Sequence, residues 1–145
     1  MTRLSVVAMA VLFGSACLST PHAMAGDGVA RIRISDGAVV LTAELEHSVA
    51  AADFLSMLPL TLTAEDYAGK EKIAYLPRKL KPAVSSEGYA PAVGDVAYYG
   101  PWGNLALFYA GAPHANGLIR LGRLRPGNVE SLRKLGPRLT IERDD

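Results

Sequence analysis

The chain has 145 residues, with 15 basic and 14 acidic side chains, three histidines and a single cysteine. This length suits one domain with an adequate core, and one cysteine excludes a disulfide within the chain. The balanced charge offers no coherent basic face, so we expect neither nucleic acid nor an anionic membrane as a partner.

The N-terminus has the features of a cleaved signal peptide. Arg3 precedes an uncharged apolar run, 4–18, and residues 23–25 read Ala-Met-Ala, a site of the kind that signal peptidase accepts. The apolar run is too short for about 30 Å of hydrocarbon, which needs roughly 20 residues, so we expect no stable membrane anchor. We therefore predict a signal peptide over 1–25, cleaved after Ala25.

The remaining segment, 26–145, is expected to be one periplasmic or secreted domain. Cleavage would remove Cys17 and leave equal numbers of basic and acidic residues. Lipid modification of Cys17 is the alternative, because the small residues 14–16 precede it. Gly14 stands where such a site usually has leucine, and the Ala-Met-Ala site follows, so cleavage after Ala25 is preferred.

The first predicted elements are a β-hairpin and a helix. Residues 29–34 alternate between apolar and polar, 35–37 read Ser-Asp-Gly, and 38–45 continue as a β-branched run, which indicates a hairpin. Apolar residues then recur at helical spacing over 48–58. We expect Ser48 to cap this helix and Pro59 to end it.

The middle of the chain reads as short strands separated by turns and loops. Residues 60–63 resume the two-residue period, and 65–69 are expected to turn the chain. The strands expected after this turn are 73–76, 96–99, 105–109 and 118–124, with loops over 79–91 and 110–117.

A second short helix and a last strand are predicted near the C-terminus. Asn128 is the expected N-cap, Gly136 the expected residue after the helix, and 138–142 the final strand. About eight strands and two helices, with no helix between most successive strands, favour a closed barrel or sandwich over a layered α/β fold. The fold class is therefore mainly β.

We find no catalytic or metal-binding pattern outside the signal peptide. His47 and His114 are far apart in sequence with no carboxylate at ligand spacing, and zinc needs three or four ligands. The acidic pairs 65–66 and 144–145 are adjacent residues, which point to opposite faces of a strand or lie in a solvated tail. We assign no catalytic residue and no metal ligand, and we expect no cofactor.

Four long runs resemble the bacterial and archaeal cyclophilin-like fold family, and together they extend over almost the whole predicted domain. The resemblance implies a closed eight-stranded barrel with two short capping helices, and a domain that occurs alone or beside flavodoxin-like domains. The runs are LPLTL (58–62), EKIAYLPRKL (71–80), GDVAYYGPWGNLALFY (94–109) and GLIRLG (117–122).

The chain departs from true cyclophilins at the motifs of their active face. The sequences F-H-R, Q-x-G-D-F and W-L-D-G-x-H do not occur. Prolyl isomerisation needs no acid or base, only a donor to the prolyl nitrogen and an apolar pocket, so a strand arginine could serve as that donor. The candidates are Arg31, Arg33, Arg120 and Arg123.

The aromatic stretch 94–111 is the main candidate for a binding site. Residues 100–103, Gly-Pro-Trp-Gly, fit a type I turn with the tryptophan at its tip. Neighbouring strand residues face opposite sides, so these aromatics either all fill the barrel or partly line an outer groove. The tyrosine hydroxyls, the Trp102 indole N–H and the Asn104 amide all need hydrogen-bond partners if buried, and so many polar groups at one place exceed what packing alone requires. The predicted binding residues are Tyr99, Trp102, Asn104, His114 and Asn116.

Three functions stay open at this point. The preferred one is non-catalytic binding of an extended peptide or small ligand at the aromatic face. The second is a periplasmic prolyl isomerase that uses a relocated arginine, and the third is a structural domain that docks a flavodoxin-like protein.

Overall fold

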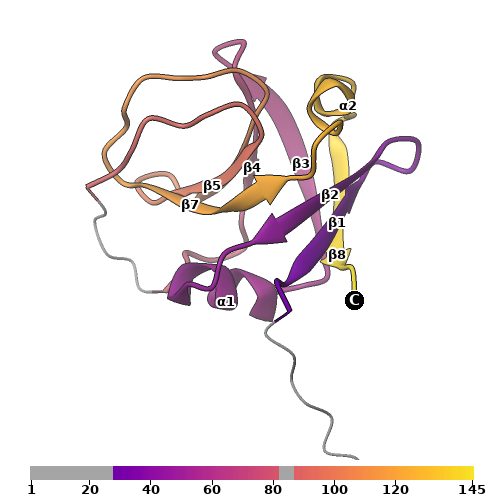
Figure 1. The fold of residues 1–145 in the computed structure, drawn as a ribbon, viewed down its shortest axis with the longest axis horizontal. Coiled ribbons are helices and arrows are strands. Elements are labelled where there is room, and N and C mark those ends of the chain that lie inside the picture. The colour runs from indigo at the N-terminus through magenta and orange to yellow at the C-terminus, as the bar shows by residue number, and fades with distance from the viewer. Residues whose placement is uncertain (1–27, 82–86) are drawn as a thin grey trace, which may run out of the picture.

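Eight antiparallel strands close into a barrel in the computed structural model, which describes residues 28–81 and 87–145 (Figure 1). The order around the barrel is β1-β2-β7-β5-β6-β4-β3-β8. The predicted mainly β class and closed eight-stranded barrel are confirmed. The strands are β1 (Arg31–Ser35), β2 (Val40–Leu45), β3 (Leu60–Tyr67), β4 (Glu71–Tyr75), β5 (Asp95–Tyr99), β6 (Asn104–Phe108), β7 (Leu118–Leu124) and β8 (Arg138–Arg143).

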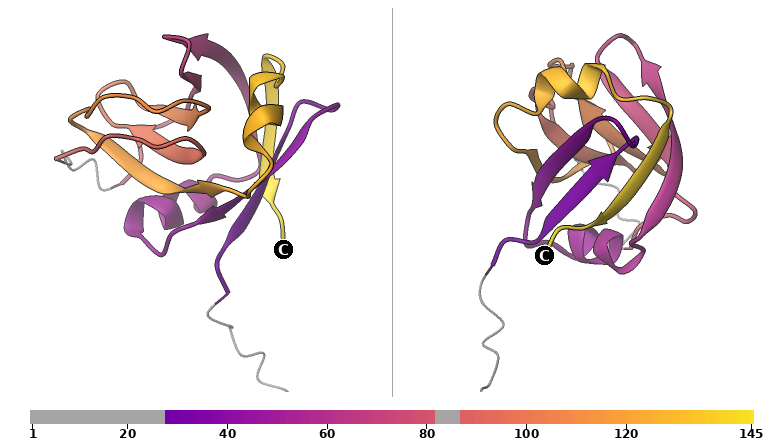
Figure 2. Two further views of the ribbon diagram at one scale, coloured as in Figure 1. Left: turned by 45° about the horizontal axis from the view of Figure 1, so that its top comes forward. Right: turned by 90° about the vertical axis from the view of Figure 1, so that its right-hand side faces the viewer.

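Two short helices, α1 (Val49–Ser56) and α2 (Val129–Arg133), lie at opposite ends of the molecule (Figure 2). None of the helices in the described ranges is long and apolar enough to cross a membrane. The predicted signal peptide, its cleavage site and Cys17 lie outside the described residues, as do 82–86 of the expected 79–91 loop.

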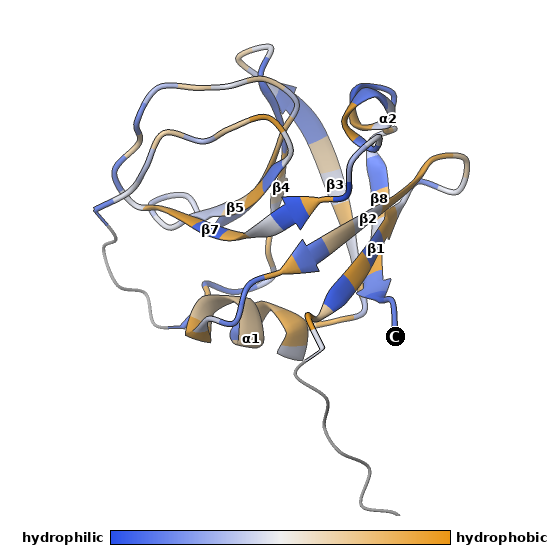
Figure 3. Ribbon diagram, in the orientation of Figure 1, coloured by the Kyte–Doolittle hydropathy of each residue, from blue (hydrophilic) through white to orange (hydrophobic). Residues whose placement is uncertain are grey.

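The β1–β2 hairpin follows its predicted alternation. Ile32 and Ile34 are fully buried, while Arg31 and Arg33 are exposed, and this two-residue period is visible along the strand in Figure 3. Asp36 holds the turn, because its Oδ1 accepts hydrogen bonds from the backbone N–H groups of residues 38 and 39 at 2.9 and 2.7 Å. These bonds stabilise the carboxylate and lower the pKa of Asp36.

Helix α1 begins as predicted. Ser48 has an extended backbone, and its Oγ accepts a hydrogen bond from the N–H of Ala51 at 3.1 Å, which satisfies one of the free donors of the first turn. Ala51 and Phe54 are fully buried against the barrel. The helix ends at Ser56, before the proline that was expected to stop it.

Tertiary contacts overturn two details of the predicted second helix. Asn128 makes no side-chain cap, because its Oδ1 accepts a hydrogen bond from the N–H of Thr42 on β2 at 2.8 Å. The C-cap is Lys134, so Gly136 is the second residue after the cap and not the first, as predicted. The N–H of Gly136 donates to Oδ2 of Asp36 at 2.7 Å, which ties this connection to the β1–β2 turn.

The turn predicted over 65–69 is also wrong, and this error matters for the site. Strand β3 continues to Tyr67, and the turn to β4 consists of residues 68–70. Ala68 and Gly69 take the left-handed conformation, with φ of 53° and 63°, which lets the hairpin close tightly. Tyr67 is thereby placed directly opposite Glu71.

Side chains of the strands themselves fill the barrel interior, as expected for a barrel of this size. Tyr98 is the largest fully buried side chain, and its hydroxyl accepts a hydrogen bond from the N–H of Leu80 at 3.2 Å. The main cluster also contains Leu105 and Leu107, the inward residues of β6. The interior is therefore an apolar core.

Candidate functional site

Strands β5 and β6 are buried on both faces, unlike the alternating strands of the β1–β2 hairpin. Their inward residues belong to the main core, and their outward residues belong to a second, smaller cluster outside the barrel. The buried members of this outer cluster are Ile73, Ala97, Ala106, Phe108 and Leu118.

Strand pairing places the outward side chains of this wall in three rows. One row crosses β3, β4 and β6, where Tyr67 is opposite Glu71 and Glu71 is opposite Phe108. Directly opposite residues of antiparallel strands lie on the same face with their side chains adjacent. This row therefore brings an aromatic ring, a carboxylate and a second aromatic ring together outside the barrel.

The other two rows explain why the wall is hollowed. In the middle row Ala106 lies opposite Ala97, and both small side chains are fully buried. In the third row Asn104 is opposite Tyr99, and Tyr99 is opposite Leu118. Small residues between two rows of large ones leave a depression, which the neighbouring side chains line.

Two loops lean together and close one side of this depression. Tyr89 forms an isolated antiparallel bridge with Ala115, and the N–H of Ala112 donates to the carbonyl of Pro91 at 3.3 Å. The contact is tight at Gly88, where a Cβ atom would lie 1.9 Å from the carbonyl oxygen of Ala115. Only glycine fits there, so the two loops are held in register.

A buried carboxylate anchors the first of these loops to the barrel. Asp95 is 1% exposed; its Oδ2 accepts a hydrogen bond from the N–H of Ala92 at 3.0 Å, and its Oδ1 pairs with Nε of Arg123 at 2.8 Å. This pair raises the pKa of the Arg123 guanidinium above its ordinary value.

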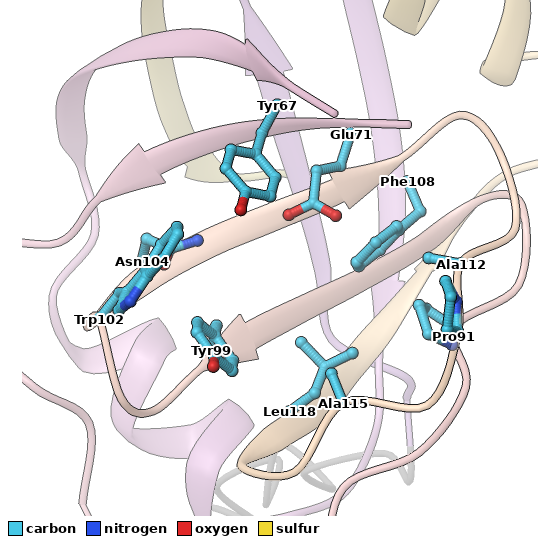
Figure 4. Close-up of a pocket in the computed structure, with 11 residues that line it drawn as sticks. Tyr67, Glu71, Pro91, Tyr99, Trp102, Asn104, Phe108, Ala112, Ala115 and Leu118 are labelled. Carbon is cyan, nitrogen blue, oxygen red and sulfur yellow. The ribbon is translucent and has the colours of Figure 1, made fainter. Parts of the chain in front are cut away.

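The result is a pocket of about 220 Å³ on the outer face of β4, β6, β5 and β7 (Figure 4). In this view Glu71 and Tyr67 enter from one side, and their polar ends point toward the space bounded by Tyr99 and Phe108. The lining residues are Tyr67, Glu71, Pro91, Tyr99, Trp102, Asn104, Phe108, Ala112, Pro113, Ala115 and Leu118.

Trp102 forms one wall of the pocket, although the turn that carries it differs from the predicted type I turn. The closing hydrogen bond runs from the N–H of Gly103 to the carbonyl of Tyr99 at 2.9 Å, one residue further apart than in a type I turn. The ring meets Tyr67 and Tyr99 edge to face, with centroids 5.4 and 5.5 Å away. Trp102 remains 46% exposed, so it borders the opening.

Two oxygen acceptors of the pocket lack a partner among the described residues. Asn104 is 1% exposed; its Nδ2 donates to the carbonyl of Leu105 at 3.1 Å, and its Oδ1 accepts no hydrogen bond. The carboxylate of Glu71 is half-buried and has no hydrogen bond or ion pair within the same ranges. Burial raises the pKa of Glu71 above its ordinary value.

The structure brings together three of the five predicted binding residues. Tyr99, Trp102 and Asn104 line the pocket. His114 and Asn116 are exposed in the adjoining loop, and they do not line the pocket; their neighbours Pro113 and Ala115 do.

Sequence reasoning missed the contribution of the β3–β4 hairpin. Tyr67 and Glu71 were assigned to a turn and its flank because the polar stretch 64–72 gives no apolar alternation. A usable signal was present: a three-residue connection containing Gly69 is typical of a hairpin, and a hairpin there would have placed Tyr67 and Glu71 side by side.

The sequence and the fold agree on one family. The protein-family model described as the cyclophilin-like family matches residues 34–142. The chain belongs to the cyclophilin-like family. The resemblance seen in the four sequence runs is thus confirmed. No curated protein matches the sequence significantly.

A solved structure has the same fold. The solution structure of a hypothetical protein from Archaeoglobus fulgidus is similar with a TM-score of 0.58 and 21% identity, over 81% of this chain and 98% of that chain. At this level of identity the likeness concerns the fold and leaves the site of this cyclophilin-like domain to be argued from its own residues.

The four arginines considered as isomerase donors do not line the pocket of this cyclophilin-like domain. Arg120 on β7 pairs with Glu46, Arg123 pairs with Asp95, and Arg33 on β1 pairs with Glu142. Arg31 is exposed on β1, which is not a neighbour of the pocket strands β4, β5 and β6. Within the described ranges no cluster of three or more His, Cys, Asp or Glu side chains is arranged to hold a metal ion.

Proposed function

We propose that this cyclophilin-like domain is a binding domain that holds a small ligand, or one side chain of an extended peptide, in the outer pocket. The observation that carries the proposal is the pocket itself, an apolar and aromatic hollow in the outer wall with the carboxylate of Glu71 among its lining groups.

The size of the pocket supports a small occupant. About 220 Å³ is below the roughly 300–1,000 Å³ of sites for drug-sized ligands, and above the ~150 Å³ of an engineered cavity that holds benzene. Apolar walls with a few placed polar groups are the usual composition of ligand sites.

Trp102 is the one tryptophan of the chain and borders the pocket, so its fluorescence reports occupancy directly. The test is a titration of the domain with small amines, alcohols and short proline-containing and extended peptides. We expect at least one class to change the Trp102 emission in a saturable way. A flat response to every class contradicts the proposal.

A blocking variant shows that the signal comes from the pocket. Ala112→Phe adds a ring at a half-buried position of the pocket wall and should abolish the response. The matched control is Ala38→Phe, an exposed loop position on the β1–β2 hairpin, which should leave the response unchanged.

An isomerase assay separates binding from catalysis. We expect residues 26–145 to accelerate prolyl isomerisation no more than an equal amount of an unrelated protein. Acceleration that is lost in Ala112→Phe would identify the pocket as a catalytic site for prolyl isomerisation.

A further inference from the structure

Glu71 is the only charged residue that lines the pocket in the described part of the chain; no lysine, arginine or histidine is among the lining residues. A half-buried carboxylate normally has an ion-pair or hydrogen-bond partner, because desolvated charge is costly. Within the described ranges Glu71 has neither. The pocket therefore carries one uncompensated negative charge.

Asn104 adds no second acceptor that a ligand can reach. Its Nδ2 donates to the carbonyl of Leu105 at 3.1 Å, and its Oδ1 is buried from solvent. The acceptor that the pocket presents is therefore the Glu71 carboxylate, so the complementary ligand is a donor.

The rest of the wall is mostly apolar and aromatic. Glu71 is opposite Phe108 at one end of the pocket, and Tyr99 and Leu118 line the wall away from it. A complementary ligand therefore has a donor at one end and an apolar body.

The aromatic walls favour a positive charge on such a ligand. Tyr67 and Tyr99 each pack against Trp102 edge to face, which leaves ring faces available to the pocket. A cation near the face of a tryptophan or tyrosine ring is attracted by the negative electron density of that face. The rings and the Glu71 carboxylate therefore both favour a positively charged ligand.

We propose that the pocket binds an alkyl chain carrying an ammonium group, with the ammonium at Glu71 and the chain against the apolar wall. This inference rests on the proposed binding function and names its ligand class. The chemistry is that of a free alkyl amine or of a lysine side chain. The small volume favours the free amine.

The test compares three probes of equal length: 1,5-diaminopentane, 1-aminopentane and 1,5-pentanediol. Trp102 fluorescence and calorimetry give the affinities at neutral pH. We expect both amines to bind, and the diol to bind at least about tenfold more weakly than either, because a hydrogen bond to a charged group is the stronger kind. N-acetyl-lysine methylamide distinguishes the peptide source, and we expect it to bind more weakly than the diamine.

Variants locate the charge. Glu71→Gln keeps the shape of the side chain and should weaken diamine binding about tenfold or more, while leaving the diol unaffected. The control is Glu65→Gln, an exposed acid on β3 that does not line the pocket, which should change neither affinity.

The outcomes separate the two proposals. A diol that binds as tightly as the diamine, or a Glu71→Gln variant with unchanged diamine affinity, overturns the ammonium proposal and leaves the binding function standing. Binding of neutral peptides alone has the same consequence. Absence of binding by every probe overturns both.

Discussion

The barrel has two walls that share one core and differ on the outside. On β1 and β8 the outward face carries exposed charged residues, with an ion pair between Arg33 and Glu142. On β5 and β6 the outward residues Ala97, Ala106 and Phe108 are buried in a second apolar cluster, beside which two loops meet. The first wall shows that the barrel closes without an outer apolar layer on every side.

The largest expected effect tests whether the outer cluster is a true second core. Phe108 points outward yet is 2% exposed, so Phe108→Ala should lower the free energy of unfolding by about 3–4 kcal/mol, like a core truncation. Urea denaturation measures this. A loss below about 1 kcal/mol would mean that the cluster is only a loosely packed surface.

The next effect concerns the anchor of the covering loop. Asp95→Ala removes the acceptor of the Ala92 N–H and the partner of Arg123, and should cost about 2 kcal/mol. Arg123 is 56% exposed, so water solvates it in the variant and the cost stays moderate. Amide exchange of Ala92 should accelerate while that of Ile34 in the β1 core stays slow. Equal acceleration at both sites would point to global unfolding instead of loop release.

A smaller effect is expected at Glu71, where a substitution should stabilise the fold. Glu71 lies directly opposite Tyr67 on the neighbouring strand, and its carboxylate is half-buried. Because burial raises the folded-state pKa of Glu71, its contribution to stability is present below the unfolded pKa and is lost as the pH rises through the folded pKa. At neutral pH the ionised group is therefore a cost.

Glu71→Gln removes that cost. It should raise the melting temperature by about 2 °C at neutral pH, and the gain should vanish below about pH 4, where the carboxyl is protonated in both states. Thermal unfolding at several pH values measures it. A variant that gains stability while it loses diamine binding is the signature of a functional residue, and a destabilised variant would assign Glu71 a structural role.

The smallest effect is expected on the charged wall. Arg33→Ala removes an exposed ion pair with Glu142 and should change the free energy of unfolding by about 0.5 kcal/mol or less. Urea denaturation of this variant beside Phe108→Ala measures the contrast between the walls. Similar losses of the free energy of unfolding in both variants would show that the two walls contribute equally to stability.

Local patterns predicted most of the elements because they act within a few residues. The alternation of Ile32 and Ile34 with arginines defines β1, and Ser48 caps α1 through a hydrogen bond three residues away. Asn128 has an equally good local pattern, but Thr42 of β2 binds its Oδ1 across the fold. A cap residue is predictable only where no distant donor competes for its side chain.

The site was predictable in part for a related reason. Tyr99, Trp102 and Asn104 lie close together in sequence, so an aromatic stretch with unmet polar atoms was visible. Whether these residues faced inward or outward depended on strand register, which the pairing of β5 with β6 and β7 decided. Glu71 comes from a strand whose polar start carries no periodic signal, and only its pairing with Phe108 brings it to the pocket.

The sequence by itself determined the fold class, most of the elements along the chain and the family, because short alternating runs and turn residues constrain the chain locally. Only the tertiary structure decided that one wall has a second apolar layer with a pocket in it. The closing of the barrel sets which side chains from β3, β4, β5, β6 and β7 become neighbours, and this brings the Glu71 carboxylate from β4 to the aromatic residues of β5 and β6.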